Sequence, residues 1–169
     1  CADYDDAEAR ALAAGARGDG LFISAYNHPD VIAGAGTIAL EVLEDLPSAG
    51  AIVVPTGGGG LLAGVTIGAD GRVPVVGVEP AVNPAFTSAL AAGHTTPLAP
   101  GASLADGLLG NLERGALTFD LIRARGYGLN SGKVKERLGS LSSEKAISLI
   151  AIHAHEIPQA FSPAALREA

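Results

Sequence analysis

The sequence lacks several features that would otherwise widen the choice of function. Among its 169 residues there is no methionine, no tryptophan and a single cysteine, Cys1. One cysteine excludes an internal disulfide and a metal cluster held by cysteines, and it favours a reducing compartment. The apolar runs are far shorter than a membrane span requires. We therefore expect a cytoplasmic protein without a membrane partner.

Charged residues are also scarce, and their balance is acidic. Only 17% of the residues are charged, and the formal net charge is −7. Because the acidic residues are scattered and no basic cluster exists, binding to nucleic acid is disfavoured. Hydrophobic residues make up 48% of the chain, which is enough for one globular domain with a core of its own.

The start of the chain is unusual as well. There is no initiator methionine, and Cys1-Ala2-Asp3-Tyr4 already has the character of a helix start. No charged segment followed by an apolar one precedes a cleavage site, so export is disfavoured. We expect residues upstream to be missing and the chain to be a fragment.

The most informative feature that is present is a run of four glycines. Gly57-Gly58-Gly59-Gly60 follows the apolar segment Ala51–Val54 and leads into a short helical pattern that begins with Leu61. Residues without a Cβ let the backbone turn tightly, and successive N–H groups at a helix N-terminus then face an anion. This order predicts a site for a phosphorylated ligand. The alternative is a tight turn alone, for which one or two glycines would be enough.

Strand and helix patterns alternate around this loop. Strands are predicted at 21–24, 51–54 and 73–78, and helices at 7–16, 29–47, 84–92 and 116–125. Such alternation predicts an α/β fold, an open and mostly parallel sheet flanked by helices in three layers. Ligands in such sheets bind at the carboxyl ends of the strands, where the glycine run lies. Beyond residue 125 the pattern weakens, and Ser142 is predicted to cap a last helix that carries Ile147 and Ile150.

Four strings, in this order, carry a resemblance to a known family. They are Asn27–Glu41 with its Pro-Asp-Val-Ile-Ala-Gly run, Val54–Gly64 with the four glycines, Val76–Pro80, and Leu104–Gly107. Together they resemble the threonine/serine dehydratases, which are pyridoxal-phosphate enzymes of fold type II. The likeness predicts a truncated domain of this type over residues 1–125. Residues 126–169 are then a poorly matched helical extension of the same domain.

The resemblance implies a lyase of amino-acid metabolism. Such an enzyme dehydrates and deaminates a small-molecule substrate, a β-hydroxy amino acid, to a 2-oxo acid and ammonia. By the same resemblance, the backbone amides of Gly57, Gly58, Gly59, Gly60 and Leu61 would hold the phosphate of the cofactor, pyridoxal 5′-phosphate. Relatives are commonly dimers or tetramers, so a homo-oligomer is possible.

The sequence departs from the family at the catalytic lysine. The family attaches its cofactor through a lysine in a Ser-x-Lys-x-Arg-Gly type of segment, and no such segment occurs here. Lys133, Lys135 and Lys145 lie in polar surroundings downstream, whereas a cofactor-binding lysine needs a lowered pKa and a position facing the cofactor. The family's late serine or threonine near the pyridine nitrogen is unmatched too. We therefore assign no catalytic residue and expect this chain alone to be inactive.

Metal binding is disfavoured for two candidate groups. In some relatives, the residue at the position of Glu79 resembles a ligand for a divalent cation. Here Asn83 and Ala85 add no carboxylate, and a single carboxylate is a poor site for a hard cation. The alternative for Glu79 is a helix-capping or solvent-facing acid. His153 and His155 would point about 200 degrees apart on a helix, which prevents joint chelation.

Two other functions stay open. Gly58 to Ala63 also fits G-x-G-x-x-A after a strand, with Glu79 near the place of a ribose-binding acid, which would make the chain a dinucleotide-binding oxidoreductase domain. This interpretation leaves the strings at 29–37 and 104–107 unexplained. The other is a non-catalytic remnant that binds phosphate or an amino acid.

Several further polar residues are weaker candidates for a site. His28 is interpreted as a solvated loop histidine in preference to a substrate contact. Asp106 is either a residue beside the cofactor or part of an Asp-Gly turn. Ser24, Thr37 and Thr56 have no activating base nearby in sequence, so none is proposed as a nucleophile.

Overall fold

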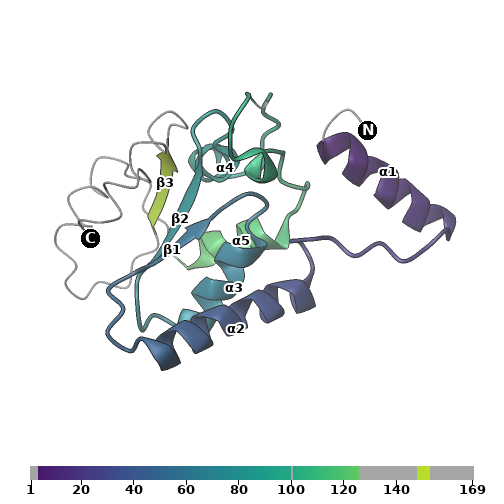
Figure 1. The fold of residues 1–169 in the computed structure, drawn as a ribbon. Coiled ribbons are helices and arrows are strands. Elements are labelled where there is room, and N and C mark those ends of the chain that lie inside the picture. The colour runs from purple at the N-terminus through teal and green to yellow at the C-terminus, as the bar shows by residue number, and fades with distance from the viewer. Residues whose placement is uncertain (1–3, 100, 126–147, 153–169) are drawn as a thin grey trace.

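The computed structural model describes residues 4–99, 101–125 and 148–152, which form helices around a small sheet (Figure 1). The elements are α1 (Tyr4–Arg17), α2 (Pro29–Asp45), β1 (Ile52–Pro55), α3 (Gly60–Ala69), β2 (Val75–Pro80), α4 (Ala85–Ala92), the 3-10 turn η1 (Asp106–Leu108), α5 (Leu117–Ala124) and β3 (Ser148–Ile152). The described part is thus an α/β structure, as the alternating sequence pattern predicts.

The sheet has the strand order β1-β2-β3, and both pairs are parallel. Ile52 lies opposite Val75 in the first pair, and Val76 lies opposite Ser148 in the second. Parallel strands place their carboxyl ends at one edge of a sheet. The glycine run after β1 and the segment after β2 therefore emerge at the same edge.

Helices α2 and α3 pack against each other at very short range. A Cβ atom on Gly64 would lie 2.3 Å from the carbonyl oxygen of Ile32, and one on Gly68 would lie 2.2 Å from that of Gly36. No real side chain tolerates such distances to backbone atoms. The close crossing of these two helices therefore depends on glycine, and it fixes α3, the helix that follows the glycine run.

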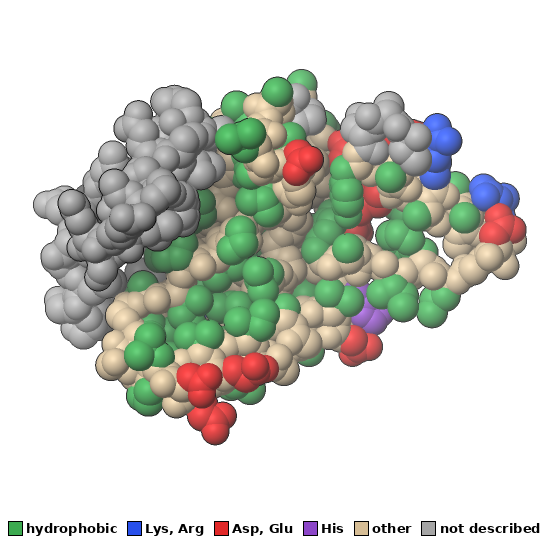
Figure 2. Space-filling view, viewed as in Figure 1, with side chains coloured by type: hydrophobic (Ala, Val, Ile, Leu, Met, Phe, Trp, Pro, Cys, Tyr) green, Lys and Arg blue, Asp and Glu red, His purple; other side chains and the backbone are tan. Residues whose placement is uncertain are grey.

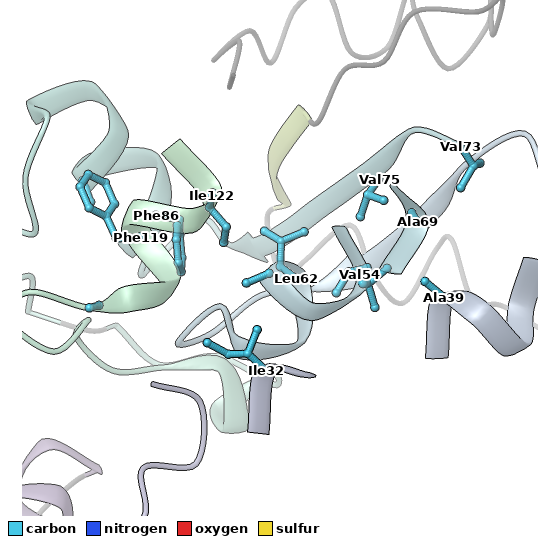
Figure 3. Packing of buried hydrophobic residues seen from close by; sticks show 14 residues of the cluster. Ile32, Ala39, Val54, Leu62, Ala69, Val73, Val75, Phe86, Phe119 and Ile122 are labelled. Atoms are coloured by element: carbon cyan, nitrogen blue, oxygen red, sulfur yellow. The ribbon is translucent and has the colours of Figure 1, made fainter. Parts of the chain in front are cut away.

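The core surrounds α3 (Figure 3). Leu62 from α3, Phe86 from α4 and Ile122 from α5 are almost wholly buried. Val54 from β1 and Ile32 from α2 belong to the same cluster. Helices α3, α4 and α5 thereby share one apolar centre with the sheet, and this centre supports the loop that precedes α3.

Two sequence predictions of secondary structure are wrong. Residues 21–24 form no strand, and Leu21 and Ile23 are exposed, because no neighbouring strand pairs with them in the described ranges. Ser148–Ile152 forms β3 beside β2, where the sequence pattern predicts a helix from Ser142. A short apolar run fits either a helix or a buried strand by periodicity alone. The other predicted elements shift by a few residues at their ends.

The exposed surface is largely apolar and acidic in the view of Figure 2. Hydrophobic side chains cover much of the face over α2 and α3, and acidic side chains gather near the end of α2. Ile38 and Leu40 on α2 and Ile67 on α3 are among the exposed hydrophobic residues. Within the described ranges, no helix has both the length and the apolarity that crossing a membrane would take.

Candidate functional site: the glycine loop between β1 and α3

The candidate site is the loop of residues 56–61, which connects β1 to α3. Thr56 ends the strand pairing, because its N–H donates to the carbonyl of Val78 at 2.7 Å. Gly59 is the N-cap of α3 and has φ 84° and ψ 1°, a left-handed conformation. A residue with a side chain is strained there, so glycine is required at this position for its backbone alone.

Neighbouring side chains press directly on the loop. A Cβ on Gly58 would lie 2.3 Å from Cγ of Tyr26, and a Cβ on Gly59 would lie 2.3 Å from Cζ of Phe86. At Gly60 a Cβ would lie 2.8 Å from Cα of Tyr26. The absence of side chains in the loop thus lets Tyr26 and Phe86 close over it, independently of any ligand.

The amide groups of the loop have a second property that packing does not explain. The carbonyls of Gly58 and Gly59 are occupied, by the hydroxyl of Thr118 and the N–H of Ala63, both at 2.8 Å. Among the residues that the structure describes, no acceptor is hydrogen-bonded to the N–H groups of Gly57, Gly58, Gly59, Gly60 or Leu61. Gly59 and Gly60 are buried. Buried donors rarely remain unpaired, so these amides fit an anionic ligand such as a phosphate.

A polar network connects the segment before α2 to the segment before α5. The carboxylate of Glu113 accepts from the hydroxyl of Ser24 and from Nδ2 of Asn27, each at 2.6 Å. The N–H of Glu113 donates to the hydroxyl of Tyr26 at 2.8 Å. Oδ1 of Asn27 accepts from the N–H of Leu117, the first residue of α5, at 2.6 Å. The network therefore holds Tyr26 and α5 on opposite ends of the same set of contacts beside the loop.

This network has consequences for Tyr26 and was not predicted from the sequence. Burial raises the pKa of Tyr26 above its ordinary value, the main cause being desolvation of the phenol. Glu113 is separated from Ser24 and Asn27 by more than 80 residues, so no local spacing signals the contacts. The only sequence signal is the presence of isolated polar residues in otherwise apolar surroundings.

Glu79 serves α4 and not a cation in this structure. Its carboxylate accepts from the N–H of Phe86 at 3.0 Å, and from the N–H and hydroxyl of Thr87 at 2.8 and 2.6 Å. These amides belong to the first turn of α4, whose free N–H groups need acceptors. The capping interpretation of Glu79 is confirmed. The cap also fixes Phe86, the residue that packs on Gly59.

Burial dominates the electrostatics of Glu79. Only 2% of the residue is exposed, and desolvation raises the pKa of its carboxyl, although the donors from Thr87 and Phe86 act in the opposite direction. In the described ranges, no group of three or more His, Cys, Asp or Glu residues is arranged to hold a metal ion. The oxygens that a cation or a ribose would need are already used by α4.

The remaining candidates have local roles or lie outside the described residues. His28 is the N-cap of α2, where its Nδ1 accepts from the N–H of Asp30 at 3.3 Å. Asp106 accepts from the N–H of Gly107 at 2.8 Å, which agrees with an Asp-Gly turn. That turn lies next to the loop, since a Cβ on Gly57 would be 3.3 Å from Cα of Leu108. Outside the described ranges lie Lys133, Lys135, Lys145, His153 and His155.

Comparisons with known proteins give one consistent result. Residues 1–151 match the family described as pyridoxal-phosphate dependent enzyme. The L-threonine ammonia-lyase of Thermotoga maritima is 37% identical over 123 residues, which cover 71% of this chain and 30% of that protein. Serine racemase of Mus musculus is 39% identical over 109 residues, which cover 62% of this chain and 32% of that protein.

Solved structures agree with the sequence comparison. A threonine deaminase whose source is given as T.th. superposes with a TM-score of 0.63 at 27% identity, covering 87% of this chain and 59% of that chain. The predicted fold, part of a fold type II α/β domain, is confirmed by this similarity. The chain spans about a third of the length of the curated relatives it matches.

Proposed function

This chain belongs to the family of pyridoxal-phosphate-dependent enzymes, and from that premise we propose that residues 57–61 bind the phosphate of pyridoxal 5′-phosphate. The observation that carries the proposal is the set of N–H groups from Gly57 to Leu61, which are hydrogen-bonded to no acceptor within the described residues. A phosphate offers several acceptor oxygens and a negative charge. Both suit the N-terminus of α3.

The surroundings of the loop supply more than donors. Tyr26 and Phe86 press on Gly58 and Gly59 and exclude water from one side of the loop. Hydrogen bonds to an anion are stronger where water is excluded. The network around Glu113 holds Tyr26 in this position, so it supports the phosphate site indirectly.

The chemistry expected of the whole site is that of a dehydratase. When bound, the cofactor supplies an electron sink for the α-carbon of an amino acid. We propose that the protein acts on a β-hydroxy amino acid, threonine or serine, and releases a 2-oxo acid and ammonia. The relatives named as threonine ammonia-lyases support this proposal. Residues 1–125 would be the cofactor-binding part, in a cytoplasmic protein that forms homo-oligomers and binds neither nucleic acid nor membranes.

Within this chemistry, the described residues have a binding function. They include no lysine, and the lysine-containing segment of the family does not occur in the sequence. The role proposed for this chain is therefore to hold and orient the phosphate end of the cofactor. Supplied with the cofactor, the chain by itself is expected to release no ammonia from threonine or serine.

Titration calorimetry with two matched ligands tests the phosphate site. Pyridoxamine 5′-phosphate is the preferred probe, because it has no aldehyde to react with surface lysines. It should bind saturably, inorganic phosphate should compete with it, and pyridoxamine without phosphate should bind far more weakly. Equal binding of both pyridoxamine compounds would contradict the proposal. Tighter binding of NAD, lost in Glu79→Gln, would support the dinucleotide alternative instead.

A further inference from the structure

One hydrogen bond reaches the glycine loop from a distant helix. Thr118 is the second residue of α5 and is fully buried. Its hydroxyl donates to the carbonyl oxygen of Gly58 at 2.8 Å, across 60 residues of sequence. No comparison assigns this residue a role, and no local pattern in the sequence indicates one.

The geometry of the peptide bond makes this contact consequential. In a planar trans peptide, the carbonyl of one residue and the N–H of the next point in opposite directions. With the carbonyl of Gly58 held toward Thr118, the N–H of Gly59 is held away from it. The carbonyl of Gly59 is held in the same manner by the N–H of Ala63, at 2.8 Å, which orients the N–H of Gly60.

The peptide between Gly58 and Gly59 needs such a restraint more than any other in the loop. Both flanking residues lack a Cβ, so sterics alone leave this peptide unit free to rotate between orientations. The next peptide is secured by α3 itself, through the bond to Ala63. For the Gly58 carbonyl, the hydroxyl of Thr118 is the protein donor in the described structure.

Thr118 is itself anchored on the opposite side. The N–H of the preceding residue, Leu117, donates to Oδ1 of Asn27 at 2.6 Å, and Asn27 is held by Glu113 at 2.6 Å. The start of α5 is therefore fixed relative to the segment that contains Tyr26. The hydroxyl of Thr118 is presented to the loop from a rigid position.

We propose that Thr118 is a positioning residue for the phosphate loop, whose hydroxyl holds the Gly58 carbonyl so that the Gly59 amide is oriented before the ligand arrives. This inference rests on the proposed function of the loop. It assigns to Thr118 no contact with the cofactor. An amide that is already oriented binds an anion without the entropic cost of ordering it.

Substitutions that remove only the hydroxyl test the proposal. Thr118→Val keeps nearly the same shape, and the dissociation constant for pyridoxamine 5′-phosphate should rise on the order of tenfold, the size of one net hydrogen bond. Thr118→Ser keeps the hydroxyl and should bind nearly as the unaltered protein does. Thr37→Val is the matched control, because the Thr37 hydroxyl makes the same kind of bond, to the Gly34 carbonyl at 2.9 Å, on an exposed face of α2.

A second readout separates positioning from a general loss of stability. The backbone amide resonance of Gly59 in the ligand-free protein should shift in Thr118→Val and stay in place in Thr118→Ser and Thr37→Val. If Thr118→Val fails to fold, Thr118→Ser and Thr118→Ala form a pair that differs by the hydroxyl alone. In that pair, only the alanine variant should shift the resonance and weaken binding.

The outcomes are distinguishable from failure of the proposed function. If the unaltered protein does not bind the phosphate compounds, the proposed function fails, and the Gly59 resonance still decides whether Thr118 orients the amide. Unchanged binding and an unmoved Gly59 resonance in Thr118→Val would overturn the inference. Equal weakening by the serine and valine variants would overturn it too, because the hydroxyl would then not be the responsible group.

Discussion

Glycines are concentrated in two regions of this molecule, and they are there for different reasons. In the α2–α3 contact, Gly64 and Gly68 let two backbones approach, and a Cβ at either would lie within 2.3 Å of a carbonyl oxygen. In the loop before α3, Gly58 and Gly59 make room for Tyr26 and Phe86, at similar distances. By packing alone, the two regions look alike.

The backbone hydrogen bonds separate them. In the helix contact, the amides of Gly64 and Gly68 belong to a continuous helix, α3, and are paired by its own carbonyls. In the loop, the amides of 57–61 are bonded to no acceptor in the described part of the chain. A glycine run therefore indicates a binding site when its N–H groups are left over, and close packing is a separate cause.

Gly68→Ala should give the largest effect on folding. Its Cβ would lie 2.2 Å from the carbonyl of Gly36, a backbone atom that moves only with the whole helix. We expect the free energy of unfolding, measured with urea, to fall by about 3 kcal/mol. Binding of pyridoxamine 5′-phosphate by the folded fraction should be unchanged.

Gly34→Ala is the matched control for that substitution. Gly34 lies on α2 as well, but a Cβ there would have nothing within 4 Å. Because alanine favours a helix over glycine, the variant should be more stable by about 0.5–1 kcal/mol. If both variants lost the same stability, the account of the α2–α3 contact would be wrong.

Gly59→Ala should affect folding and binding together. A residue with a side chain is strained at φ 84°, and the Cβ would also meet the Phe86 ring, the far end of a side chain that can shift. Unfolding should become easier by about 2 kcal/mol, and binding of pyridoxamine 5′-phosphate should weaken as well. Lost stability with intact binding would remove the distinction between the two glycine regions.

Glu79→Gln tests the cap that holds Phe86 on the loop. Glutamine replaces one acceptor oxygen by a donor, which leaves the N–H of Thr87 unpaired in a buried place. The free energy of unfolding should fall by about 2 kcal/mol. Glu44→Gln, on the exposed side of α2, is the control and should have almost no effect.

The effect of Glu79→Gln should also depend on pH. Burial raises the pKa of Glu79 from its ordinary value of 4.5, so above this value the folded state keeps a proton that the unfolded state has lost. The stability of the unaltered protein then falls as pH rises through the window above 4.5. Since glutamine does not titrate, the difference between the two proteins should shrink with rising pH. A difference that grows instead would contradict the direction of the shift.

Glu113→Gln should give the smallest effect. One of the two acceptor oxygens for Ser24 and Asn27 is replaced by a donor, in a half-buried site. We expect a loss of about 1 kcal/mol in urea denaturation, with a modest loss of binding because Tyr26 is held less firmly. Glu41→Gln, exposed on α2, serves as the control. An effect no larger than the control's would show that the network does not stabilise the loop.

The parallel fold and the position of the glycine loop could be predicted from the sequence, because both follow from local patterns. A strand, a run of glycines and a helix are adjacent in the chain, and their order alone places the loop at the carboxyl edge of the sheet. The strand β3 is predicted as a helix, since a five-residue apolar run does not reveal its partner, β2.

The support of the loop could not be predicted, because it is made by residues far apart in sequence. Thr118 reaches Gly58 across 60 residues, and Glu113 reaches Asn27 across 86. Each of these side chains is an ordinary polar residue in its local context. Glu79 could be interpreted as a cap from the sequence, but its partner helix is visible only in three dimensions.

A phosphate titration followed by backbone amide resonances tests the central claim most directly. Pyridoxamine 5′-phosphate is added to the ¹⁵N-labelled chain, and the amide shifts are followed residue by residue. The account predicts that the amides of Gly57 to Leu61 shift most and saturate together, while those of Gly64 and Gly68 change little. Saturable binding that moves amides elsewhere and leaves the loop unchanged would contradict it.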